Sequence, residues 1–223
     1  MLLKEATWKI IHLSHASERD DLVKAIEEQV GATCFEAVKG ESVKEKYATL
    51  NHPLPGQPIR SGLFGCSQSF YEVLKVLETT STEYVGIFED DCRFKECNQT
   101  IESWISTLPS FDICFLGVTE PVEYSTLNSD TLQVKRFWGA HSILFKRSII
   151  PLLFKTFDSY FEKKTIPIPD WWFSSAIKEY SLTAFCANPC NLFCHQEEGL
   201  TSYLTGSIRN NTKHLKEYPK KDK

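Results

Sequence analysis

The run Tyr84-Val85-Gly86-Ile87-Phe88-Glu89-Asp90-Asp91 indicates the fold of this chain more directly than any other stretch. Its first five residues form a short apolar run, which predicts a strand covered on both faces of a sheet. Three carboxylates follow the strand immediately. Because such close negative charges repel one another, the triplet is either an acidic turn in water or a site for a hard divalent cation such as Mg²⁺ or Mn²⁺. Ligands usually bind at strand ends of this kind in α/β sheets, which favours the metal site.

The chain before this strand predicts a strand, a helix and a second strand. Residues 8–13 are mostly apolar, residues 20–30 carry apolar side chains at helical spacing, and residues 33–38 form another strand. Gly31 suits the end of the helix, because glycine readily adopts the left-handed conformation there. Strand, helix and strand within about thirty residues form a βαβ unit, which predicts parallel strands.

The segment that leads into the acidic strand predicts a loop and then a helix. Residues 41–63 contain three prolines, which predicts a long loop of the kind that is often functional. Ser69 and Glu72 have the spacing of a capping box, so we expect a helix to begin there and to end near Glu78.

Helices and strands alternate again beyond the acidic triplet. A helix is expected over residues 97–107 and a buried strand over residues 111–117, followed by a polar loop over residues 118–130. Two short strands, residues 132–137 and 142–145, come next, and the glycine-containing segment between them is expected to interrupt the sheet.

A further helix is expected to begin at Asp170, an effective N-cap residue, and to open with Trp171 and Trp172. Residues 1–206 are expected to form a single domain. Residues 207–223 are polar and rich in lysine, and are expected to form a tail.

Composition narrows the possible functions. The chain has 223 residues, 42% of them hydrophobic, and a net charge of −4, which argues for a folded globular protein and against bulk binding of nucleic acid. We expect no transmembrane segment, no signal peptide and a cytoplasmic location, because no apolar run approaches the ~20 residues that span a bilayer. The eight cysteines are then expected to be mostly reduced thiols in the core.

One group of cysteines suggests a third class of protein, a zinc-stabilised interaction protein. Cys186, Cys190 and Cys194 precede His195, but their spacing is not one of the usual zinc-binding patterns. This is the weakest of the functional hypotheses.

Several segments together resemble glycosyltransferase family 25, which includes lipopolysaccharide glycosyltransferases and collagen galactosyltransferases. The resemblance spans residues 7–203 and is carried by the order and spacing of moderately specific motifs. The motifs are Gly62-Leu63-Phe64-Gly65-Cys66-Ser67-Gln68-Ser69-Phe70, Ile87-Phe88-Glu89-Asp90-Asp91, Phe111-Asp112-Ile113-Cys114-Phe115-Leu116-Gly117, Gly139-Ala140-His141 and Pro169-Asp170-Trp171.

The resemblance implies an α/β fold of the GT-A-like (Rossmann-like) type, with a mostly parallel sheet flanked by helices. It implies an inverting, metal-dependent transferase that moves a hexose, galactose or glucose, from a UDP-sugar donor to a hydroxyl-bearing glycan or protein acceptor. Leu63 and Phe70 stand where the family usually has Glu and His, and His12 replaces a common Asn. These departures leave the identity of the donor open.

On this interpretation the acidic triplet holds Mn²⁺ or Mg²⁺, which would neutralise charge on the leaving diphosphate. Asp91 is the first choice of direct ligand, with Asp90 assisting and also contacting the donor. His195 is a further candidate ligand from the C-terminal segment. Glu89 is assigned a catalytic role through contact with the sugar or positioning of the site.

Inversion by direct displacement also needs a base for the acceptor hydroxyl, and Asp170 is the candidate. Its other interpretation is an ordinary helix cap. Trp171 and Trp172 could stack on a sugar, although tryptophans are as often part of the core. Arg19 is expected to meet the donor phosphates, and His141 to hydrogen-bond donor or acceptor.

The alternative function is a non-catalytic module that binds a sugar or nucleotide sugar on the same fold. The departures at Leu63 and Phe70 suggest it, whereas the retained carboxylates favour the enzyme. Because function depends on the site and not on the fold, the sequence leaves both open.

Overall fold

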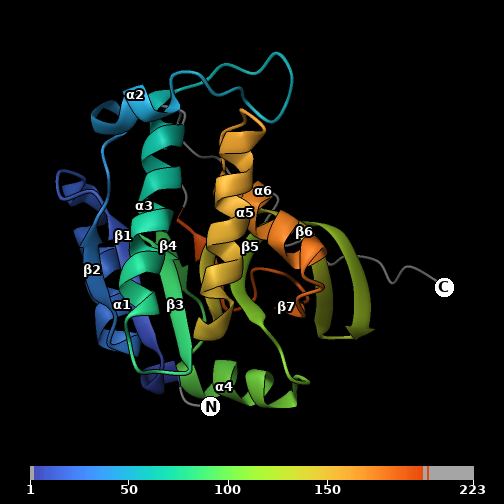
Figure 1. Ribbon diagram of the computed structural model, residues 1–223. Helices are drawn as coiled ribbons and strands as arrows, with labels where there is room; N and C mark the ends of the chain where they lie inside the picture. The colour runs from blue at the N-terminus through green and yellow to red at the C-terminus, as the bar shows by residue number, and fades with distance from the viewer. Residues whose placement is uncertain (1–2, 198–199, 201–223) are drawn as a thin grey trace.

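The computed structural model describes residues 3–197 and residue 200, so the predicted tail over residues 207–223 lies outside the described residues. A six-stranded sheet forms the centre of the molecule, in the order β2-β1-β3-β6-β5-β7 (Figure 1). The strands are β1 (Thr7–His12), β2 (Thr33–Glu36), β3 (Tyr84–Glu89), β5 (Ile113–Asn128), β6 (Thr131–Lys146) and β7 (Ala184–Ala187).

The strand directions confirm the expected α/β fold with a mostly parallel sheet flanked by helices. β1 is parallel to β2 and β3, and β5 is parallel to β7. β6 is antiparallel to β3, β5 and β7, so every strand of the sheet except β6 has the same direction. The predicted βαβ unit is present at the N-terminal end of the chain.

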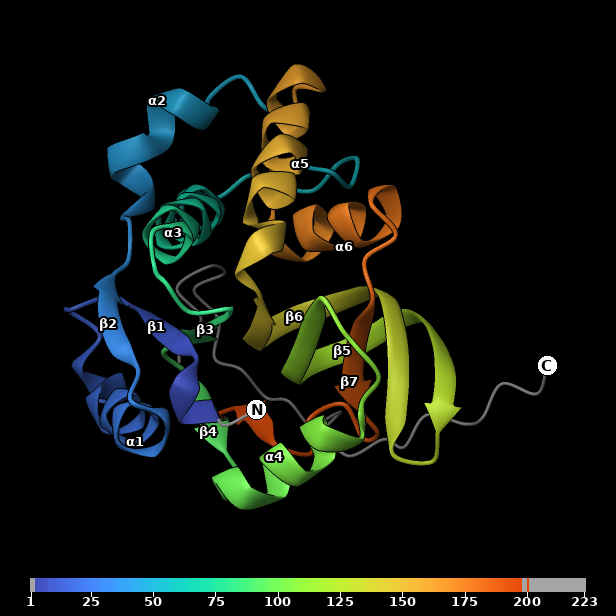
Figure 2. The ribbon, with the colours of Figure 1, turned by 60° about the horizontal axis from the view of Figure 1, so that its bottom comes forward.

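Helices cover both faces of this sheet (Figure 2). They are α1 (Asp20–Val30), α2 (Lys44–Tyr47), α3 (Ser61–Glu78), α4 (Asn98–Thr107), α5 (Ile150–Glu162) and α6 (Pro169–Glu179). α3, α5 and α6 contribute to one buried apolar cluster, and α1 and α4 contribute to a second. In β3, Ile87 belongs to the first cluster and Phe88 to the second, because successive side chains of a strand point to opposite faces. The short apolar run therefore is the doubly covered strand that its composition predicts.

A small second sheet brings the C-terminal segment back to the acidic triplet. β4 (Cys92–Phe94) follows the triplet directly and pairs antiparallel with β8 (Cys194–Gln196). The backbone N–H of Glu197 then donates to the carbonyl oxygen of Asp91, at 2.8 Å. Residues more than a hundred positions apart are thereby held at one edge of the main sheet.

The N-terminal boundary predicted from the sequence for helix α3 is wrong. This helix begins at Ser61, inside the segment expected to be a loop, and α2 occupies another part of that segment. Ser69 is no cap: it lies inside the helix, where its hydroxyl donates to the carbonyl oxygen of Gly65 at 2.7 Å. The capping-box pattern misled because Ser69 contacts a distant segment, accepting a hydrogen bond from the backbone N–H of Val38 at 2.8 Å.

The polar loop expected over residues 118–130 is also wrong. Residues 118–128 are the second half of β5, and only residues 129–130 form a turn. β6 continues as one strand through Gly139, whose positive φ of 62° accommodates the local irregularity. β5 and β6 form a long hairpin whose end projects from the sheet (Figure 2). Many of its residues near the tip are exposed, which explains why most side chains there are polar although most of the backbone is that of a strand.

Gly86 in β3 is required by the packing of Trp8. The two residues are paired across β1 and β3, and a Cβ at Gly86 would lie 2.0 Å from Cζ3 of the fully buried indole. Gly86→Ala is therefore expected to lower the free energy of unfolding by about 1–3 kcal/mol through overpacking, as measured by urea denaturation. In a Trp8→Leu background, which removes the clash, the same substitution should cost less; an equal cost in both backgrounds would contradict this explanation.

Candidate functional site

A cavity of about 300 Å³ lies at the carboxyl ends of β1, β2 and β3, beside the beginning of α3. Part of its wall is apolar, made by Ile11, Leu13, Ala37, Val38 and Phe70. The carboxylates of the acidic triplet line it as well, together with Arg19. A wall that combines apolar and charged side chains suits a ligand that has both a flat ring and charged groups.

Two glycines allow the loop after β2 to pack closely against the beginning of α3 in the wall of this cavity. A Cβ at Gly40 would lie 1.8 Å from the carbonyl oxygen of Ser61, and one at Gly65 would lie 2.5 Å from that of Val38. The loop after β2 and the first turns of α3 can approach so closely only because both residues lack a side chain.

Gly65→Ala is expected to push the loop after β2 away from α3, because the atoms in its way belong to the backbone. For the UDP-sugar donor that the sequence predicts, we expect binding of UDP to weaken by about tenfold or more, since an overpacked contact of this kind costs about 1–3 kcal/mol. Calorimetry is the measurement, and Val76→Ala, at an exposed position of the same helix outside the cavity, is the control that should leave the affinity unchanged. Unchanged affinity in Gly65→Ala would separate the loop from the binding site.

Asp90 is the anchor of a buried ion-pair network. The guanidinium of Arg19 contacts its carboxylate directly and lies 3.8 Å from that of Asp91. Burial by itself disfavours the charged guanidinium, but Asp90 and Asp91 outweigh this and raise the pKa of Arg19. Nδ1 of His12 is 3.0 Å from Asp90, and Nε2 of the same ring is 3.4 Å from Asp20. His12 is therefore part of this ion-pair network.

This network assigns Asp90 a role different from its sequence-based one. We expected it to hold metal and donor, but its oxygens are engaged by Arg19 and His12. Arg19, expected at the donor phosphates, lies on the cavity wall but is paired with Asp90. Both residues therefore contribute to the position and charge of the site, and direct contact with a ligand stays a prediction.

Gln196 is a site residue that the sequence did not indicate. Its side-chain amide donates to the Glu89 carboxylate at 3.1 Å and is thereby held against the acidic triplet. A glutamine near the C-terminal end of a chain carries no motif, and only the pairing of β4 with β8 brings it here. The only hint in the sequence that this segment reaches the acidic triplet was the neighbouring His195, which was a candidate metal ligand.

His195 itself lies on the other face of the small sheet. It is paired with Arg93, whereas Gln196 is paired with Cys92, and side chains alternate along a strand. Nε2 of His195 is 3.7 Å from the carboxylate of Glu197, which also accepts from Arg93. The arrangement therefore gives no support to His195 as a metal ligand: Gln196, one position later, is the residue that faces the triplet.

His141 is buried between two backbone carbonyls. Its Nε2 is 3.1 Å from the carbonyl oxygen of Cys194, and its Nδ1 is 3.2 Å from that of Gly139. A Cβ at Gly117 would lie 2.2 Å from Nε2, so this glycine makes room for the ring. The observed contacts join β6 to β8, and the contact with donor or acceptor that we expected stays a prediction.

Asp170 lies in the first turn of α6 and contacts β6. α6 begins one residue earlier, at Pro169, so Asp170 is not its N-cap. The carboxylate accepts hydrogen bonds from the backbone N–H groups of Gly139, at 2.9 Å, and Ala140, at 3.5 Å. Burial raises the pKa of this carboxyl, and the two hydrogen bonds oppose the shift only in part.

The register of β6 places Asp170 at the same edge of the sheet as the acidic triplet. Ser142 is paired with Phe88 in the antiparallel β3–β6 ladder. The residues before Ser142, which include Gly139 and Ala140, therefore lie beside the carboxyl end of β3. Asp170 is not among the residues that line the cavity, however, and its role as the base stays a prediction.

Of the two tryptophans after Asp170, only one reaches the surface. Trp172 is fully buried, and its indole N–H donates to the carbonyl oxygen of Leu153, so it belongs to the core. Trp171 is half-buried and packs on Trp138 of β6, with ring centroids 5.3 Å apart. The sequence suggested Trp171 and Trp172 as neighbouring aromatic rings for a sugar. In the structure, Trp171 of α6 packs instead on Trp138 of β6.

The carboxylates fit a metal that is completed by a ligand. Within residues 3–197, no three His, Cys, Asp or Glu side chains are grouped so as to hold a metal ion by themselves. Mg²⁺ is usually bound by one or two carboxylates together with phosphate oxygens of a substrate, and Asp91 and Glu89 on one cavity wall offer such hard donors. The hypothesis of a zinc site at Cys186, Cys190, Cys194 and His195 likewise has no support, because these side chains form no metal-binding group in the described part of the chain.

The cysteines behave as the sequence predicts. All eight are free thiols, and Cys92, Cys114, Cys186, Cys190 and Cys194 are buried. Burial raises the pKa of the Cys92 thiol, and its hydrogen bond with Cys194 adds to the shift. Cys190 donates to the carbonyl oxygen of Val118 at 3.3 Å. These thiols pack in the core.

Comparisons with known proteins give structural likeness only. No family model and no curated protein matches the chain. Its structure is similar to that of mouse xyloside xylosyltransferase 1 in the apo form, with 10% sequence identity and a TM-score of 0.40, over 79% of this chain and 69% of that one. It is also similar to the inositol-1-phosphate CTP transferase of T. maritima, with 13% identity and a TM-score of 0.44, over 81% and 84% of the two chains. None of the described helices has the length and apolar character to cross a membrane.

Proposed function

We propose that this chain is a metal-dependent transferase that moves a hexose, galactose or glucose, from a UDP-sugar to the hydroxyl group of a glycan or protein acceptor. The observation that carries the proposal is the cavity itself. Its apolar side chains suit the flat base of a nucleotide, and its charged side chains suit a diphosphate that binds together with a divalent cation.

The charge of the cavity explains why a divalent cation would be needed. The wall carries two cationic side chains, Arg19 and Lys39, and four carboxylates, Glu41, Glu89, Asp90 and Asp91. A diphosphate would be repelled by this excess of negative charge unless a cation came with it. Asp91 would hold the metal with help from Glu89, and the bound metal would stabilise negative charge on the leaving diphosphate.

The chain's own residues then have separate tasks. Arg19 fixes Asp90 and places a positive charge 3.8 Å from Asp91. Gln196 fixes the carboxylate of Glu89, which is then positioned towards the sugar. The acceptor oxygen forms the new bond to the anomeric carbon while the bond to the diphosphate breaks, which inverts that carbon. Asp170 takes the proton of the acceptor hydroxyl, and its raised pKa makes it a stronger base than an ordinary aspartate.

A donor screen tests the function. UDP-galactose, UDP-glucose and other nucleotide sugars are incubated with the protein, with Mn²⁺ or with EDTA, and released UDP is measured. We expect metal-dependent hydrolysis of at least one UDP-hexose. Binding of UDP without hydrolysis or transfer would favour the alternative, a non-catalytic nucleotide-sugar module, and absence of UDP binding would overturn both.

A further inference from the structure

Lys39 lies on the wall of the candidate cavity, in the loop that follows β2. Its side chain is exposed, and among residues 3–197 no carboxylate pairs with its ammonium group. Glu41, two positions further along the same wall, is instead 3.9 Å from Lys44. A positive charge that lines a cavity and has no partner in the described part of the protein is available to an anion that binds there.

The second cation of the wall, Arg19, is already engaged by the acidic triplet. Its guanidinium contacts the carboxylate of Asp90 and lies 3.8 Å from that of Asp91. The charge of Arg19 therefore offsets part of the negative charge of the triplet. Lys39 differs from it in that its charge is not offset by a neighbouring acidic group.

The backbone around Lys39 is held in place on both sides. Before it, the N–H of Val38 donates to the hydroxyl of Ser69 in α3 at 2.8 Å. After it, Gly40 packs against the backbone at the beginning of α3. The carbonyl oxygen of Lys39 itself accepts from the N–H and the hydroxyl of Ser42, at 3.0 and 2.7 Å. Because the backbone is fixed, only the rotamers of the lysine side chain have to be ordered when a ligand binds.

We propose that Lys39 binds the diphosphate of the donor through a charge-assisted hydrogen bond to a phosphate oxygen. This inference rests on the proposed function and adds to it a residue that recognises the charge of the donor. In the sheet, β1 lies between β2 and β3, so the ends of β2 and β3 are about 10 Å apart, two strand spacings. Lys39 follows β2, and the candidate metal ligand Asp91 follows β3. A diphosphate in the cavity would then have the metal on one side and Lys39 on the other.

The chemistry of a lysine side chain suits this position. An ammonium group is a compact charge with three donors on a flexible stem, so it can follow a phosphate oxygen whose exact place depends on the metal. Hydrogen bonds between an ammonium and a phosphate are among the strong ones, because both groups are charged. A nucleoside without phosphates offers Lys39 no such oxygen. The contribution of Lys39 to binding should therefore depend on the phosphates of the ligand and not on its base.

Calorimetry with uridine and with UDP, each in the presence of Mn²⁺, tests this contact without requiring turnover. Lys39→Met removes the charge and keeps an unbranched apolar side chain. We expect it to weaken UDP binding by about tenfold or more, the usual worth of a hydrogen bond to a charged group, and to leave uridine binding unchanged. Lys39→Arg, which keeps the positive charge, should retain most of the affinity for UDP.

The matched control is Lys24→Met, because Lys24 is an exposed lysine of α1 that does not line the cavity. It should bind both ligands as the unmodified protein does. Equal affinity for UDP in Lys39→Met and in the unmodified protein would overturn the contact. Equal weakening of uridine and UDP would overturn it as well, because Lys39 would then act on the shape of the cavity.

Failure of the proposed function is recognised separately, because the unmodified protein would then not bind UDP. In that case lysine acetylation, read by mass spectrometry, decides on Lys39 alone, with inorganic pyrophosphate and Mn²⁺ as the probe. Protection of Lys39 but not of Lys24 would support an anion site at Lys39 without a nucleotide. Equal acetylation of Lys39 with and without the probe would overturn the inference.

Discussion

Asp91→Ala is expected to abolish the metal dependence of UDP binding and to lower transfer by at least about 10²–10³-fold, the usual loss when a group that stabilises developing charge is removed. Asp91 is buried on the cavity wall, directly after the strand that positions it. Without its carboxylate, a divalent cation would lose its principal protein ligand. Calorimetry with UDP, with Mn²⁺ and with EDTA, measures the first effect, and product formation measures the second.

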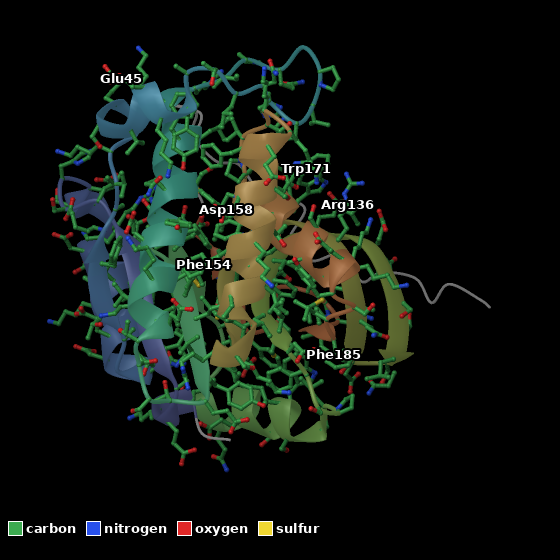
Figure 3. The ribbon with its side chains drawn as sticks, viewed as in Figure 1. Glu45, Arg136, Phe154, Asp158, Trp171 and Phe185 are labelled. Atoms are coloured by element: carbon green, nitrogen blue, oxygen red, sulfur yellow. The ribbon has the colours of Figure 1, made fainter. Side chains whose placement is uncertain are left out.

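Two further variants control this experiment. Asp91→Asn keeps the shape of the side chain but removes its charge, so it should reproduce the loss while disturbing packing less. Asp158→Asn removes an exposed carboxylate on α5 that does not line the cavity (Figure 3), and should leave binding unchanged. Equal affinity for UDP with Mn²⁺ and with EDTA in the unmodified protein would disprove the metal site.

Asp170→Asn is expected to lower transfer by about 10²–10⁴-fold, the usual worth of general base catalysis, while UDP affinity stays nearly unchanged. The amide keeps the shape of the side chain and one hydrogen-bond acceptor for the N–H of Gly139, but it cannot take a proton. Single-turnover transfer to a working acceptor is the measurement, alongside a donor titration. This split distinguishes a base from a metal ligand, whose loss would weaken donor binding as well.

The pH profile gives an independent check of the same residue. A base must be ionised to act, so activity should rise as the pH increases through the pKa of Asp170. Because burial raises that pKa, the rise should occur at higher pH than for an ordinary aspartate. The residual activity of Asp170→Asn should lack this rise. Full activity in the variant would leave Asp170 with only its contact to β6, and Glu89 would become the next candidate.

Local sequence was a good guide where one element is covered on both faces. The run before the triplet predicted β3, because a short stretch without polar residues is typical of a strand whose two faces are both buried. The helical spacing before Gly31 likewise predicted α1 and its end, and Gly31 has the left-handed φ of 72° that this position requires. In both cases the residues that decide the structure are neighbours in the chain.

Local sequence failed where a distant contact decides. α3 begins at Ser61 because its first turns pack against the loop after β2 through Gly40 and Gly65, and a capping pattern eight residues later could not reveal that. The second half of β5 was taken for a loop because its side chains are polar. It is a strand because β6 supplies its backbone hydrogen bonds.

The sequence by itself determined the α/β class of the fold, the carboxylates at the end of a buried strand and the choice of Asp170 as a candidate base. All of these depend on residue type and on neighbours along the chain. The tertiary structure decided which groups meet at the site. It pairs Arg19 with Asp90, brings Gln196 rather than His195 to Glu89, and replaces Trp172 with Trp138 beside Trp171. Such contacts depend on strand register, and a shift of one residue in a strand exchanges the side chains on its two faces.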